Sequence, residues 1–186
     1  MGKTNLLLRL ISVVAALSVF SGVPAAHAQP QPSTIVSTTG LTLDCSSIPN
    51  TAQAHQIAAS LGICGYGKSG GIHPDNTVYG TCGSLTLTLS QWNHSYVRWY
   101  VNITSILGNM DAESYAGSAH NAQTGGGGPV SAIGTQFTTS WDSVQFLYFL
   151  PGNIHGEIPP GGAYSHLWWG ANCYNASAVT SDIYHY

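Results

Sequence analysis

The chain has 186 residues, of which 6% are charged, and its formal net charge is −3. So few basic residues exclude the positive surface that binding to nucleic acid or to an anionic membrane requires. Threonine, serine, glycine, asparagine and tyrosine are abundant instead. This composition is typical of an exported all-β protein rather than of a cytosolic enzyme.

The first 28 residues have the pattern of a secretory signal peptide. Lys3 and Arg9 make a basic start, residues 10–20 are an apolar run, and residues 26–28 form a small-residue cleavage site. The run is too short to span a membrane comfortably, and no later stretch reaches the roughly 18 uncharged apolar residues that a span needs. We therefore expect a secreted chain, extracellular or at the cell surface, that begins at Gln29.

After this cleavage, two basic residues face seven acidic ones, which gives a formal charge of −5. The remaining length suits one domain with a core of its own. Residues 29–44 start with a proline-containing polar stretch and are either a flexible leader or an edge strand. Residues 45–186 are expected to form the single domain.

Residues 83–107 are the most regular stretch and predict two consecutive strands. Every second residue from Leu85 to Leu89 is apolar, and after a polar break the same alternation runs from Val97 to Ile103. Each strand therefore has one face to bury, which requires a second layer. The sequence predicts an all-β protein, a disulfide-stabilised antiparallel β-sandwich with one short N-terminal helix.

That helix is predicted just after the first cysteine. Asn50 is a candidate N-cap, apolar residues follow at helical spacing from Ala54 to Leu61, and Gly62 can end the helix.

Shorter patterns predict the remaining elements. Further strands are expected at residues 77–79, 110–120, 130–140, 143–150, 163–169 and 173–180. Residues 144–150 are apolar on nearly both faces, so we place this strand in the centre of a sheet, paired with residues 130–140. Residues 65–75, 122–129 and 151–162 are rich in glycine and proline and are predicted to be loops; the run Gly125–Pro129 is expected to fit no regular element.

Four cysteines follow the predicted cleavage site: Cys45, Cys64, Cys82 and Cys173. An even number in an oxidising compartment predicts two disulfide bonds. Three pairings are open. We favour Cys45–Cys64, which closes a short loop around the helix, with Cys82–Cys173, which ties an early strand to a late one. Because no C-x-x-C spacing occurs, a metal site built from cysteines is the weaker interpretation.

Two enzyme motifs match formally within residues 62–71. Residues 62–69 fit the phosphate-loop pattern, but that motif needs a strand before it and a helix after it, and here the predicted helix comes before. Residues 67–71 fit the G-x-S-x-G elbow, with His73 and Asp75 nearby, but no strand leads into them. We expect neither nucleotide binding nor a serine hydrolase, and no cofactor.

Two further groups of residues could carry chemistry. His155, Glu157 and His166 are potential metal ligands, but their spacing matches no compact motif, and we assign no metal site. Asp111 and Glu113 would share one face of a strand and could divide acid and base roles. They could equally belong to a solvated strand face, so no catalytic residue is assigned.

Aromatic side chains are the best functional indication. Five rings are candidates for ligand binding: Tyr96, Tyr100, Tyr164, Trp168 and Trp169. Exposed rings offer a large rigid contact area at a small entropic cost. We expect a non-catalytic binding or surface-interaction module whose partner is a glycan or another extracellular protein. The alternatives are a secreted hydrolase that uses histidine and carboxylate groups beside residues 151–162, and a purely structural surface protein.

Overall fold

A computed structural model describes residues 34–66 and 82–186, which belong to one compact unit. The predicted signal peptide, the strand predicted at residues 77–79, the elbow motif and the second half of the phosphate-loop match lie outside the described residues. No helix within the described ranges is long and apolar enough to cross a membrane.

The described elements are mostly strands. In chain order they are β1 (Thr34–Asp44), the 3-10 turn η1 (Cys45–Ser47), α1 (Ala52–Leu61), β2 (Gly83–Gln91), β3 (Tyr96–Ser105), β4 (Met110–Asn121), β5 (Gly127–Gly134), β6 (Ser140–Tyr148), β7 (Gly152–Ile158), β8 (Ala163–Leu167), β9 (Asn172–Asn175) and β10 (Val179–His185).

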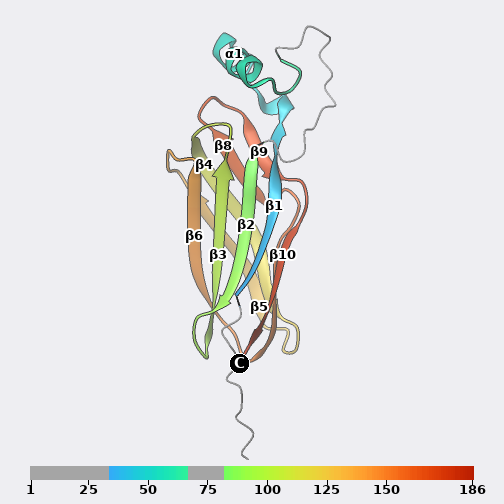
Figure 1. Ribbon diagram of the computed structural model, residues 1–186. Coiled ribbons are helices and arrows are strands. Elements are labelled where there is room, and N and C mark those ends of the chain that lie inside the picture. The colour runs from blue at the N-terminus through green and yellow to red at the C-terminus, as the bar shows by residue number, and fades with distance from the viewer. Residues whose placement is uncertain (1–33, 67–81) are drawn as a thin grey trace, which may run out of the picture. The chain divides into compact units, whose positions relative to one another are not determined.

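The strands pair in the order β10-β7-β4-β8-β9-β1-β2-β3-β6, with β5 added to β4 (Figure 1). Every pairing between these strands is antiparallel. Strand β1 joins the two layers, because residues 34–41 pair with β2 and residues 41–44 pair with β9. The predicted antiparallel sandwich is confirmed, although the sheet does not close.

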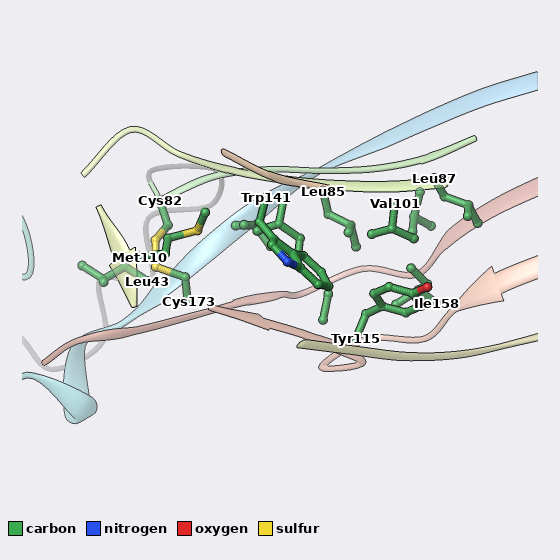
Figure 2. Packing of buried hydrophobic residues seen from close by; sticks show 14 of the residues in the cluster. Leu43, Cys82, Leu85, Leu87, Val101, Met110, Tyr115, Trp141, Ile158 and Cys173 are labelled. Atoms are coloured by element: carbon green, nitrogen blue, oxygen red, sulfur yellow. A yellow bond between two sulfur atoms is a disulfide. The ribbon is translucent and has the colours of Figure 1, made fainter. Parts of the chain in front are cut away.

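The alternation in β2 and β3 has the predicted effect. Leu85, Leu87 and Val101 are fully buried, as are the other apolar positions of the pattern. Figure 2 shows these three side chains pointing toward Tyr115 and Ile158 of the other layer. The two faces therefore form a single core between the layers.

Trp99 of β3 is fully buried between the two layers. Its ring stacks on that of Tyr115 in β4, with 6.3 Å between ring centroids and 25° between planes. Opposite it, β7 has Gly156, where an added Cβ would lie 2.7 Å from the Trp99 ring. A glycine at this position therefore makes room for the indole.

Helix α1 begins one residue later than predicted. Thr51, not Asn50, is the N-cap, and its hydroxyl accepts a hydrogen bond from the Ala54 amide at 3.2 Å. Gly62 ends the helix with φ +64°, as the sequence indicates.

Both favoured disulfide bonds are confirmed. Cys45–Cys64 spans 19 positions around α1, and Cys82–Cys173 spans 91 positions. The second bond lies in the core beside Met110 and Leu43 (Figure 2). It fixes the start of β2 to β9 of the other layer.

The loop prediction at residues 122–129 is wrong at its end, because β5 starts at Gly127 and includes Pro129. Strand β5 lies at an edge of the sheet and pairs only with β4, a position where a strand tolerates proline. Gly127 has φ +144°, and an added Cβ would lie 2.1 Å from the Ala119 carbonyl oxygen. The glycine thus permits a close approach of two strands.

The loop prediction at residues 151–162 is wrong over most of its length, because β7 spans Gly152–Ile158. Its inward positions alternate between glycine and isoleucine: Gly152, Ile154, Gly156 and Ile158. Two glycines at inward positions conceal the apolar alternation. The strand predicted at residues 173–180 is in fact two strands, β9 and β10, and the second continues to His185.

Two strands lie in other positions than predicted. Strand β6 pairs only with β3 and ends the strand order, so it is an edge strand and not a central one. It does not pair with β5, which lies in the other layer beside β4. Strand β1 pairs with β2 through residues 34–41 and with β9 through residues 41–44, so its first part has one paired neighbour, as an edge strand has, and its last part joins the two layers. The apolar character of β6 on both faces therefore reflects exposed rings, not double burial.

Candidate functional site

Four aromatic side chains gather on the outer surface of β3, β6 and the turn before β3. They are Trp92, Tyr96, Phe146 and Tyr148, and we call them the aromatic face. Their exposed fractions are 60%, 40%, 48% and 63%. Tyr96 lies directly opposite Tyr148 in the pairing of β3 with β6, so strand alternation directs both rings outward.

The rings contact one another in tilted pairs. Trp92 and Phe146 have centroids 5.0 Å apart with 54° between planes, and Tyr96 and Tyr148 have centroids 5.9 Å apart with 74° between planes. The side chain of Asn93 shapes the turn that holds Trp92, because its Oδ1 accepts hydrogen bonds from the amides of Ser95 and Tyr96 at 2.8 and 2.9 Å. The aromatic face is therefore ridged and not a coplanar row.

Polar side chains cover the rest of this outer surface. The Tyr100 hydroxyl and the Asn102 amide both donate to Oδ1 of Asp142, at 2.5 and 2.7 Å. This hydrogen bond from Tyr100, together with partial burial, raises the pKa of the Tyr100 phenol, so it stays protonated at neutral pH. Hydroxyl pairs join the neighbouring strands, for example Thr38 with Thr86 at 3.0 Å.

Charge is sparse on this surface. Of the outward-facing residues of β2, β3, β6 and the part of β1 that pairs with β2 (residues 34–41), only Arg98 and Asp142 carry charged side chains. The guanidinium carbon of Arg98 lies 5.3 Å from the centroid of the Tyr100 ring. The surface thus combines rings, hydroxyls and amides with one positive and one negative group.

Of the five rings predicted to bind a ligand, two belong to this surface. Tyr96 is part of the aromatic face, and Tyr100 is two residues farther along the same side of β3. Tyr164 is half-buried on β8 and donates to Oδ1 of Asn172 at 2.9 Å, while Trp168 is 44% exposed in the following turn. Trp169 is only 6% exposed, so the prediction that its ring is accessible to a ligand is wrong.

Trp169 is buried because its indole packs into the core and Nε1 donates to the Leu107 carbonyl at 3.3 Å. Sequence reasoning also missed three rings of the aromatic face: Trp92, Phe146 and Tyr148. The available signal was the apolar run of residues 144–150, which predicts exposed rings once β6 is known to be an edge strand.

The three potential metal ligands His155, Glu157 and His166 do not gather around one point. His155 Nδ1 lies 2.7 Å from Asp182 Oδ1, and its Nε2 lies 3.9 Å from Glu157 Oε2. His166 instead contacts Asp111, with 2.5 Å between Nδ1 and Oδ1. Across the part of the chain that the structure describes, no three His, Cys, Asp or Glu side chains are placed to hold a metal ion together.

Asp111 and Glu113 do not share a face, contrary to the prediction. The register of β4 with β8 shifts between Met110 and Ala112, which is a bulge. Asp111 consequently faces outward toward His166, while Glu113 is fully buried in the core. The two carboxyl groups cannot act as a surface acid and base pair.

Glu113 makes stability depend on pH. Its carboxyl oxygens have no side-chain hydrogen-bond partner among the described residues, and the backbone of Gln136, which lowers the pKa of the group, only partly offsets the effect of burial. Burial raises the pKa of Glu113 above its ordinary value of 4.5, and the charge of Asp111 raises it further. A raised folded-state pKa gives stability that is fully present below the ordinary pKa and is lost as the pH rises through the folded-state pKa.

We therefore expect the free energy of unfolding to fall with rising pH in this window, and Glu113→Gln to remove that part of the dependence. Urea denaturation of the two proteins at a series of pH values measures the difference. Glu157→Gln, a change at an exposed carboxylate, controls for the loss of one negative charge. If the free energies of unfolding of Glu113→Gln and of the natural chain differed by the same amount at every pH, Glu113 would not be the source of the pH dependence.

A hollow of about 260 Å³ adjoins the aromatic face. It is lined by Ala119, Gly127, Gly128, Pro129, Val130, Leu147, Tyr148 and Phe149. It therefore lies between β5 of one layer and the end of β6 of the other, where the sheet is open. Tyr148 borders both the hollow and the aromatic face.

A second hollow, of about 380 Å³, is lined by Ala116, Gly117, Ser118, Glu157 and Pro159. Glu157 is the ionisable residue among the described residues that line it. The described lining of this hollow therefore does not combine a histidine with a carboxylate, and the hydrolase alternative requires that combination.

Comparisons with protein-family models, curated proteins and solved structures gave no match. The functional argument therefore rests on the geometry of the site.

Proposed function

We propose that this chain is an exported binding module that holds a single chain of a neutral polysaccharide on its aromatic face. The observation that carries the proposal is the gathering of four exposed rings on one surface that has only two charged side chains. The two disulfide bonds are consistent with an oxidising, extracellular compartment.

The chemistry of the surface matches a sugar polymer. A pyranose ring has apolar C–H faces and a rim of hydroxyl groups, so it is recognised by aromatic rings beside hydrogen-bonding groups. The aromatic face supplies the rings. Tyr100, Asn102 and Thr88 lie beside it on β2 and β3 and supply hydroxyl and amide groups. A neutral ligand requires no excess of either charge, which agrees with the single Arg98 and single Asp142.

The tilt of the rings favours a single polymer chain over a flat crystalline surface. In each contacting pair the planes differ by 54° or more, so one flat surface cannot lie against both rings. A single chain can twist and present successive sugar units at different angles. The hollow beside Tyr148 offers space for a substituent or a chain end.

Trp92→Ala is expected to weaken binding to a soluble neutral glucan or mannan by about tenfold or more, because an exposed indole offers the largest contact area of the four rings and tryptophan often carries a large share of the contact energy. Calorimetry and affinity electrophoresis with the purified full chain measure this effect. Trp168→Ala is the matched control, because it removes an exposed indole from another surface, and it should leave affinity unchanged. Both variants should keep the thermal midpoint of the natural chain.

Failure of every neutral glucan and mannan tested to bind would overturn the proposal. Binding that depends equally on Trp168 would show that the aromatic face is not the site. A protein ligand whose affinity depends on Trp92, in the absence of any polysaccharide binding, would assign the face to protein recognition instead.

A further inference from the structure

Among the described strands, β5, β6 and β10 pair with one neighbour or end the strand order along their whole length, and β1 has one paired neighbour over residues 34–40. Natural proteins protect such edges with proline, lysine, bulges or covering segments, because an open edge pairs with other strands. Strand β5 has Gly127, Gly128 and Pro129 at its start. Strand β10 lies against β1, where the Ser181 hydroxyl donates to the Ile35 carbonyl at 3.2 Å.

Strand β6 has none of these protections among residues 34–66 and 82–186. Its nine residues contain no proline, glycine or lysine, and their register with β3 runs without a break from Ser140 to Tyr148. Asp142 is its single charged residue. A strand of this length and composition at an edge is suited to pairing with another strand.

The free backbone groups of β6 can be assigned from its pairing with β3. The Phe149 amide donates to Ser95, and the Thr139 carbonyl accepts from Ser105, at 3.1 and 2.9 Å. In an antiparallel ladder these groups alternate, so odd-numbered residues of β6 bond to β3. The amides and carbonyls of Asp142, Val144, Phe146 and Tyr148 therefore point away from β3 toward the open edge.

We propose that the occupant of this edge is β6 of a second copy of the chain, paired antiparallel across a two-fold axis that passes between the two Gln145 residues. This inference goes beyond the proposed function and does not depend on it. In this register even-numbered residues of one copy lie opposite even-numbered residues of the other. The free backbone amides and carbonyls of the two copies can therefore bond to each other.

The register is self-complementary in its side chains. Val144 lies opposite Phe146 of the partner subunit, and an aromatic residue opposite a β-branched residue is a favourable cross-strand pair. Asp142 lies opposite Tyr148 of the partner subunit, so a carboxylate meets a hydroxyl donor. An axis at Asp142 would instead set two carboxylates opposite each other, and an axis at Val144 would set Asp142 opposite an apolar ring.

Strand β6 itself carries exposed apolar side chains. Three of the 14 exposed large hydrophobic side chains among the described residues belong to it: Val144, Phe146 and Tyr148. Because the two-fold axis is perpendicular to the joined sheet, both aromatic faces lie on the same side of it. Phe146 and Tyr148 of the partner subunit therefore extend the binding surface of the first copy.

The test is the mass of the full chain in solution, measured by sedimentation or light scattering without polysaccharide. The natural chain is expected at twice the mass of one copy. Val144→Lys, which places a charge at the open edge opposite an aromatic ring, should raise the dimer dissociation constant by about tenfold or more. Val36→Lys is the matched control on the outer face of β1, which β2 and β3 separate from β6, and it should leave the dimer intact.

A cysteine scan tests the register. Residues on the axis form a pair without backbone hydrogen bonds, where the Cα atoms approach to about 4.5 Å, close enough for a disulfide bond. Gln145→Cys should therefore give a covalent dimer on oxidation, and Val144→Cys should not. A monomer at every protein concentration would overturn the proposal. So would a dimer that survives Val144→Lys but is lost in Trp92→Ala, since that dimer would form through the aromatic face.

Discussion

Replacing Trp99 by alanine is expected to lower the free energy of unfolding by about 3 to 5 kcal/mol, the usual cost of removing a large ring from a core. The indole is fully buried, stacks on Tyr115 and fills the space left by Gly156. Its loss opens a cavity between the layers. The effect is large, because the whole free energy of unfolding of a typical domain is only about 5 to 15 kcal/mol. Urea denaturation with tryptophan-independent detection, such as far-ultraviolet circular dichroism, measures the change.

Tyr100→Ala is the neighbouring control for this prediction. The Tyr100 ring faces outward, so its removal forfeits mainly cross-strand contacts, each worth about 0.2 to 1 kcal/mol, and the hydrogen bond to Asp142. If Tyr100→Ala proved more destabilising than Trp99→Ala, the orientation of β3 described above would be wrong.

Removing the Cys82–Cys173 disulfide bond by a double alanine replacement should cost about 4 to 5 kcal/mol, and removing Cys45–Cys64 should cost about 3 kcal/mol. The difference of about 1.4 kcal/mol follows from the entropy of closing a loop of 91 positions instead of 19 in the unfolded chain. Alanine is chosen because Cys82 and Cys173 are fully buried, where a serine hydroxyl would need a partner.

Denaturation curves of the two double variants and the natural chain test this order. Mass spectrometry of the natural chain under non-reducing conditions should first show both bonds formed. A larger loss of stability from Cys45–Cys64 than from Cys82–Cys173 would contradict the loop-entropy account.

The strands that sequence reasoning found are those whose inward positions are large and apolar. Leu85, Val97 and Trp99 repeat every second residue, and that period can be read without knowing the fold. Strand β7 was missed because Gly152 and Gly156 occupy inward positions, and their suitability depends on what lies across the core. Gly156 is explained by Trp99 and Leu89, which lie across the core and are distant in sequence.

Sequence reasoning found only the part of the candidate site that follows from alternation within one strand. Alternation within β3 suffices to direct Tyr96 and Tyr100 outward. The contribution of Phe146 and Tyr148 depends on the pairing of β3 with β6 and on the position of β6 at an edge, neither of which periodicity determines. The bulge near Met110, which turns Glu113 into the core, also lies beyond what alternation predicts.

The double pairing of β1 has a consequence for the order of folding. The hairpin of β2 and β3 closes through a short turn and can form early, because its contacts are local. Residues 41–44 of β1 must wait for β9, near the other end of the chain. Long-range pairing of this kind slows folding, because the entropy of closing the large loop is lost before any contact compensates for it. The first described strand therefore reaches its final partner only after nearly the whole chain has emerged from the ribosome.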